Sequence, residues 1–121
     1  MIAALERGPS TADLALAYEH AWDRLDFETI WALSSLSLRD GLDRRSFARV
    51  KRAAYASADH PTGLVASATV EDLAESGDVA AAITALVLHD GSTVHHEVGM
   101  ARRMGRWEVT GYTLRPEDAP A

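Results

Sequence analysis

The chain of 121 residues is predicted to fold as a single α+β domain. Three observations predict this class. Apolar residues recur at helical spacing until about residue 58, apolar and polar residues alternate from about residue 64, and two turn dipeptides, Asp90-Gly91 and Gly105-Arg106, separate alternating segments. A helical first half followed by a meander of antiparallel strands limits the architecture to a small set.

The first helix is expected over about residues 11–25. Ser10 is a favourable N-cap residue, and Asp13 at the third helical position comes close to completing a capping box. Tyr18 and Trp22 follow at helical spacing on one face. This face is therefore expected to pack on the rest of the domain.

Two further helices are expected at about 27–35 and 44–58. Asp26 can cap the first of them, and Asp43 can cap the second. Phe47 marks the inward face of the later helix, whose many basic residues are expected to lie on a solvated face.

Four antiparallel strands should follow, at about 64–74, 78–89, 92–104 and 107–114. Asp-Gly is a strong signal for a two-residue hairpin loop, so Asp90 and Gly91 would place Ala85 opposite His96. A second turn at Gly105-Arg106 would place Arg103 opposite Glu108, a favourable cross-strand pair.

This register divides the sheet into two faces. The face expected to point into the core carries Ile83, Val87, Val94, Val98, Met100, Met104, Trp107 and Val109, with His96 among them. The opposite face is expected to be partly exposed. Large apolar side chains on an otherwise polar face commonly mark association. We therefore predict a homodimer through this outer face, with an interface formed by Leu86, Leu88, Tyr112 and Leu114.

Three segments resemble the nuclear transport factor 2-like superfamily: the helical run 18–26, the short helix 27–34 and the terminal Gly-Arg-Trp-Glu-Val at 105–109. The resemblance implies N-terminal helices packed on the concave face of a curved antiparallel sheet, a cone. Its members include isomerases and polyketide cyclases, dehydratases, small-ligand binders and dimerisation modules, so the fold does not decide the function. Residues 1–121 would form one such domain, with flexible ends at 1–9 and 115–121.

Composition narrows the function classes. The net charge of −6 argues against binding to nucleic acid or to an anionic membrane. The chain has no cysteine, no signal-peptide pattern and no apolar run of membrane-spanning length, and we expect a cytoplasmic protein. No metal-ligand spacing, nucleophile motif or phosphate loop is present, so we expect neither metal nor cofactor.

Candidate pocket residues are those that could line the cone: Tyr18, Trp22, Asp26, Trp31, Tyr55, His96 and Trp107. His96 is the most informative, because imidazole acts as acid, base or hydrogen-bond partner near neutral pH. The competing interpretation is a histidine satisfied by a backbone group or a helical carboxylate. Asp26 is equally explained as a helix cap and the aromatics as plain core, and Glu19 is expected to be solvated.

Three functions therefore stay open. The leading one is a homodimeric module that binds a small apolar ligand, without catalysis. The first alternative is an isomerase, cyclase or dehydratase that uses His96 with Asp26 or Tyr18. The second is a protein-interaction or dimerisation module with a filled core.

Overall fold

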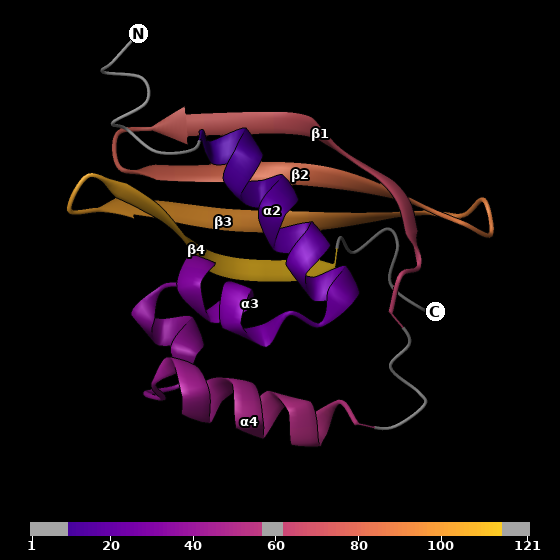
Figure 1. Cartoon of the computed structure of the whole chain (residues 1–121). Coiled ribbons are helices and arrows are strands. Elements are labelled where there is room, and N and C mark those ends of the chain that lie inside the picture. Colours follow the sequence, from indigo (N-terminus) through magenta and orange to yellow (C-terminus); the bar gives the residue numbers. More distant parts are fainter. Residues whose placement is uncertain (1–9, 57–61, 115–121) are drawn as a thin grey trace, which may run out of the picture.

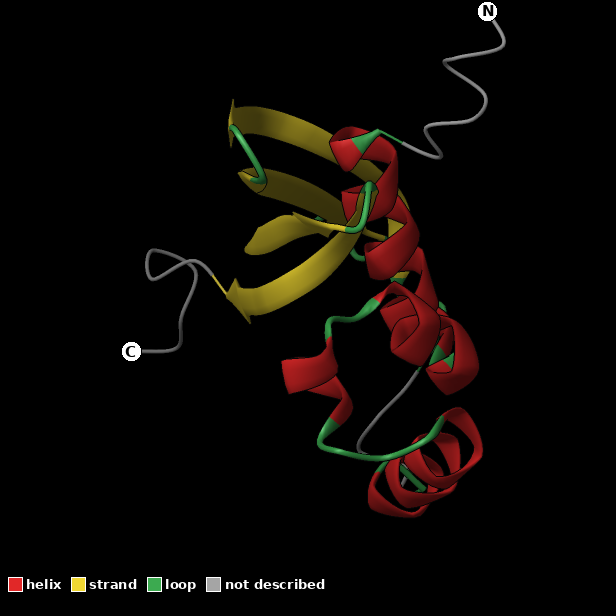
Figure 2. Ribbon diagram, turned by 90° about the vertical axis from the view of Figure 1, so that its left-hand side faces the viewer, coloured by secondary structure: helices red, strands yellow, loops and turns green. Residues whose placement is uncertain are grey.

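The computed structural model describes residues 10–56 and 62–114, so the expected flexible ends at 1–9 and 115–121 lie outside the described residues. The α+β class is confirmed, with helices on one face of a four-stranded antiparallel sheet of order β1-β2-β3-β4 (Figures 1 and 2). The elements are α2 (Thr11–Arg24), α3 (Phe27–Leu33), the 3-10 helix η1 (Leu36–Arg39), α4 (Arg44–Ala54), β1 (Val65–Ser76), β2 (Val79–Leu88), β3 (Thr93–Arg103) and β4 (Arg106–Leu114).

The three predicted N-caps are all present. The side chains of Ser10, Asp26 and Asp43 each accept a hydrogen bond from the backbone N–H three residues later, at 3.1, 3.3 and 2.8 Å. Such bonds satisfy N–H groups that the first helical turn leaves without partners. Local chemistry therefore sets where the helices begin.

The helices lie at different distances from the sheet. Helix α2 crosses one face of the sheet, while α4 lies farthest from the sheet and packs on α3 (Figure 1). Their apolar side chains meet those of the sheet in one core, formed by Leu14, Ala15, Tyr18, Ala21, Phe27, Ile30, Phe47, Ala48, Ala80, Ala82, Val98, Met100 and Val109. None of the described helices is long and apolar enough to cross a membrane.

The predicted register between β2 and β3 is wrong by one residue. The loop has three residues, 89–91, because the Leu88 N–H donates to the Ser92 carbonyl and Gly91 takes a left-handed φ of 89°. Thr84 therefore lies opposite His96, in place of Ala85.

A shift of one residue moves the side chains of one strand to the other face of the sheet. The β3 residues keep their predicted inward face, but β2 turns over. Thr84 and Leu86 point inward, while Ile83 and Val87 point outward, and Val87 is 39% exposed. Two expected core residues on β2, Ile83 and Val87, thus lie on the face of the sheet opposite α2.

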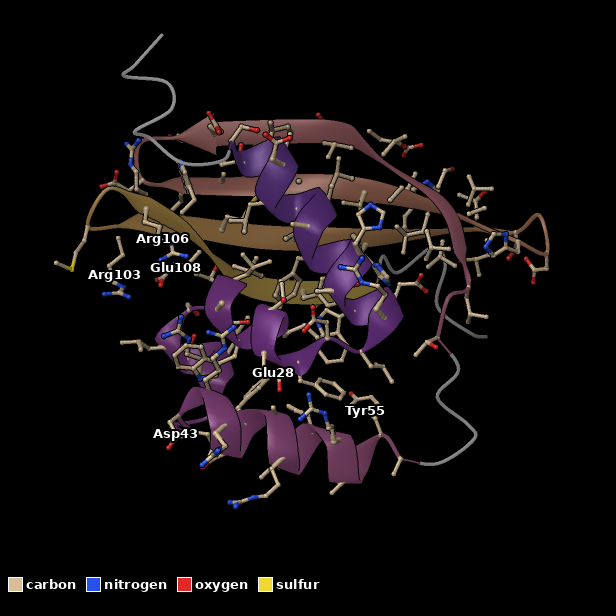
Figure 3. The ribbon with its side chains drawn as sticks, viewed as in Figure 1. Glu28, Asp43, Tyr55, Arg103, Arg106 and Glu108 are labelled. Carbon is tan, nitrogen blue, oxygen red and sulfur yellow. The ribbon has the colours of Figure 1, made fainter. Side chains whose placement is uncertain are left out.

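The second hairpin also turns one residue early. Met104 and Gly105 form its loop with left-handed φ angles of 55° and 76°, so Arg103 lies opposite Arg106 and Met104 is 92% exposed instead of buried. The expected ion pair still forms, because Arg103 and Glu108 are diagonal neighbours with N···O distances of 3.0 Å (Figure 3).

Candidate ligand pocket

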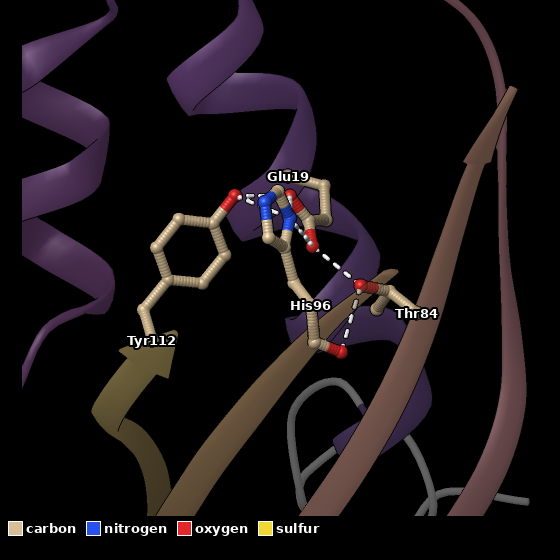
Figure 4. Close-up of polar contacts among 4 residues, drawn as sticks. All are labelled: Glu19, Thr84, His96 and Tyr112. Carbon is tan, nitrogen blue, oxygen red and sulfur yellow. Dashed lines mark hydrogen bonds and ion pairs between the residues drawn. The ribbon is translucent and has the colours of Figure 1, made fainter. Parts of the chain in front are cut away.

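A buried carboxyl group, that of Glu19 on α2, is the centre of a polar cluster between α2 and the sheet (Figure 4). Glu19 is only 2% exposed. Its Oε2 accepts a hydrogen bond from Thr84 Oγ1 at 2.5 Å, and its Oε1 accepts one from the Tyr112 hydroxyl. The Nδ1 atom of His96 lies 3.0 and 3.1 Å from the two carboxyl oxygens.

The sequence places these groups together through two simple periodicities. Glu19 follows the buried Ala15 by one helical turn and precedes Trp22 by three residues, so it lies on the inward face of α2. Thr84 and His96 are cross-strand partners, and both side chains point toward α2. A bulge between β3 and β4 brings Tyr112 to the same face, opposite Val98.

The hydrogen-bond roles around His96 follow from its neighbours. A carboxylate only accepts, and the phenol hydrogen of Tyr112 is already donated to Glu19, so both groups near Nδ1 offer acceptors. We therefore assign the ring proton to Nδ1. Within residues 10–56 and 62–114, no group forms a hydrogen bond with Nε2.

Tyr112 is fixed as a proton donor. Burial raises the pKa of its hydroxyl far above the ordinary range, and the charge of Glu19 and the hydrogen bond to it raise the pKa further. The side chain therefore remains a neutral phenol at neutral pH. It supports the carboxyl of Glu19 and does not itself serve as a base.

Beside this cluster lies a pocket with a volume of about 230 Å³. Its walls are largely apolar, and the polar cluster forms one side. The lining residues are Glu19, Trp22, Asp23, Leu64, Val65, Leu86, Leu88, Val94, His96 and Tyr112. Asp23 is occupied in holding the start of β1, since its Oδ1 accepts from the Leu64 N–H at 2.9 Å. His96 thus presents a ring nitrogen, Nε2, that is left for a ligand. The Nε1 atom of Trp22 also has no hydrogen-bond partner among the described residues, but it is buried.

A second pocket, of about 240 Å³, shares two aromatic lining residues with the first. Trp22 and Tyr112 line both pockets and stack with ring centres 6.2 Å apart and planes 8° apart. Tyr18 and Lys51 help to line the second pocket. The stacked pair therefore borders two hollows of similar size.

Three of the seven predicted pocket residues, Tyr18, Trp22 and His96, line these hollows. The hydroxyl of Tyr18 is within hydrogen-bond distance of Ser34 Oγ, at 3.0 Å. His96 projects from the face of the sheet that packs on α2. Glu19 was missed, because an isolated glutamate on a helix is usually solvated; its place in line with the inward stripe of α2 was the available signal.

The other four predicted residues line neither pocket. Asp26 caps α3 and also accepts from Thr29 Oγ1 at 2.7 Å, which lowers the pKa of its carboxyl. Trp31 donates from Nε1 to the Leu42 carbonyl at 2.9 Å. Tyr55 packs beside Phe27, with ring centres 5.6 Å apart, while Arg102 lies over the ring of Trp107.

Three of the four predicted interface residues, Leu86, Leu88 and Tyr112, do not lie on the outer face. Leu86 is 5% exposed, and it lines the first pocket together with Leu88 and Tyr112. The shifted loop turned Leu86 inward, and the β4 bulge did the same for Tyr112. The side chain of Leu114 lies outside the described part of the chain.

Comparison with known proteins gives a fold but no family. The chain matches no protein-family model, and no curated protein matches it significantly. One solved structure is similar: a SEC-C motif containing protein from Rhodopseudomonas palustris, 22% identical, with a TM-score of 0.56 over 89% of this chain and 83% of that one. At this identity the similarity shows a shared fold alone.

Proposed function

We propose that the protein is a small-ligand-binding module of the nuclear transport factor 2-like type, whose ligand occupies the pocket beside His96. The observation that carries the proposal is an apolar hollow of about 230 Å³ with one imidazole held at its side by a buried carboxyl group. Ligand pockets are mostly apolar, with a few fixed polar groups that set orientation.

The size of the pocket limits the ligand. A protein cavity of about 150 Å³ lined by apolar side chains binds benzene. A pocket of about 230 Å³ therefore suits one substituted ring or a short branched chain.

An enzyme that transfers protons through His96 is the second candidate. Its support is the pairing of Nδ1 with Glu19, because a buried carboxyl group on one imidazole nitrogen orients the other toward a substrate. Glu19 takes the role first considered for Asp26 or Tyr18, since Asp26 caps α3 and Tyr18 contacts Ser34. An isomerisation would need only a proton removed from one carbon and returned to another.

We also propose a homodimer through the face of the sheet opposite α2, which none of the described helices covers (Figure 2). With the observed register this face carries Ile83 and Val87 on β2, where we first expected Leu86. Exposed apolar groups on a sheet face support association. Sedimentation velocity at micromolar concentration tests it, and a monomer would contradict it.

A ligand titration followed by NMR tests the binding function. We expect millimolar toluene or p-cresol to shift the amide signals of Leu86, Val94 and His96 in a saturable way. Leu86→Trp should fill the pocket and abolish these shifts, whereas Val87→Trp, on the opposite face, should leave them intact. No saturable shift with either compound would contradict the proposed function.

A further inference from the structure

The Glu19 cluster specifies which kind of polar group the ligand must bring. Three donors converge on this one carboxyl group: the hydroxyls of Thr84 and Tyr112, and Nδ1 of His96. A neutral imidazole carries one N–H. With that N–H directed at Glu19, Nε2 presents a lone pair, so it accepts a hydrogen bond and cannot donate one.

The rest of the pocket specifies an apolar body. Leu86, Leu88 and Val94 form aliphatic walls, and Trp22 and Tyr112 add two aromatic rings. Aromatic groups favour offset or edge contacts with another ring. Burying a charged ligand against such walls would be costly unless it were fully paired.

We propose that the pocket selects a neutral single-ring molecule whose hydroxyl donates a hydrogen bond to Nε2 of His96, a phenol or a cyclic alcohol. This inference rests on the proposed binding function and adds the ligand class to it. Glu19 is then a positioning residue: it touches no ligand atom in this role, but it determines that His96 accepts. This ligand class excludes molecules that present only a hydrogen-bond acceptor to Nε2 of His96.

The test compares ring compounds of nearly equal shape by NMR titration of the full chain: p-cresol, toluene, 4-methylanisole and benzoate. One hydrogen bond contributes about 0.5–1.5 kcal/mol net, so p-cresol should bind about two- to tenfold more tightly than toluene. 4-Methylanisole, whose oxygen cannot donate, should bind no better than toluene. Tighter binding of 4-methylanisole or benzoate than of p-cresol would overturn the inference.

Glu19→Gln tests the positioning role through selectivity. The amide N–H of glutamine can donate to Nδ1, which moves the ring proton to Nε2 and makes that atom a donor. The preference should then reverse, with 4-methylanisole bound more tightly than p-cresol. Glu97→Gln is the matched control, because Glu97 is exposed on the opposite face of β3 and should leave the preference unchanged.

Nitrogen-15 chemical shifts of the His96 ring in the unliganded protein provide a readout that needs no variant. They should report a protonated Nδ1 and an unprotonated Nε2. A proton on Nε2, whether alone or together with one on Nδ1, would overturn the inference even if Glu19→Gln failed to fold. Equal binding of toluene and p-cresol would remove the hydroxyl preference but leave the binding function intact, whereas absence of all binding would remove both.

Discussion

Because the pKa of Tyr112 is raised in the native protein, the free energy of unfolding should fall at high pH. Its phenol is neutral in the native protein well above the pH at which an unfolded tyrosine ionises, about 10. The native state therefore holds this proton more tightly than the unfolded state does. The associated stability is fully present below about pH 10 and is lost as the pH rises toward the native pKa.

The magnitude follows from the linkage relation. Between about pH 10 and the native pKa, one retained proton lowers the free energy of unfolding by about 1.4 kcal/mol per pH unit. Tyr112→Phe removes this proton and the hydrogen bond to Glu19. The variant should be about 1–3 kcal/mol less stable than the native protein at pH 8, the cost of leaving a buried group with one partner fewer.

The difference between the two proteins should shrink by about 1.4 kcal/mol at pH 11. Urea unfolding followed by circular dichroism at pH 8 and pH 11, at one ionic strength, measures it. Leu86→Ala is the control, because it disturbs the same pocket without a titrating group and its destabilisation should not depend on pH. A Tyr112→Phe difference that stays constant would refute the assignment of a buried neutral phenol.

Three further changes probe the fold and the assembly. Asp26→Ala should lower the free energy of unfolding by about 0.5–2 kcal/mol in urea melts, through loss of the α3 cap and without change in the NMR shifts produced by p-cresol. Gly105→Ala should cost about 1–2 kcal/mol in the same assay, because residue 105 has a φ of 76°; an unchanged stability would contradict the turn. Ile83→Glu should convert a dimer to a monomer in sedimentation velocity, and a persisting dimer would place the interface elsewhere.

The helix starts and the inward face of β3 could be predicted because interactions between residues close in sequence determine them. Ser10, Asp26 and Asp43 begin helices because their side chains accept from nearby backbone N–H groups. The inward face of β3, with His96 on it, followed from simple alternation. Neither prediction required knowledge of distant contacts.

The errors arose at two turns and a bulge. Asp90-Gly91 suits a two-residue loop, but the chain closes the hairpin with three residues and Gly91 in the left-handed region. That one extra loop residue reverses the direction in which the β2 side chains point. Leu86, a predicted interface residue, therefore lines the pocket. The bulge before Tyr112 acted in the same way on β4.

Only one of the two central residues of the site, His96, could be predicted from the sequence. His96 was identifiable from its strand position, but the burial of Glu19 depends on partners 65, 77 and 93 residues away in the sequence. A buried carboxyl group is tolerable only when such partners satisfy it. The local sequence of the helix does not indicate that these partners will be present.

The most direct measurement is the set of intermolecular nuclear Overhauser effects between bound p-cresol and the methyl groups of the protein. It tests the pocket and the sheet register together. We predict cross-peaks from the p-cresol ring and methyl protons to Leu86 and Val94, and none to Ile83 or Val87. Cross-peaks to Ile83 and Val87 instead would place the ligand on the face of the sheet opposite α2 and contradict the proposed site.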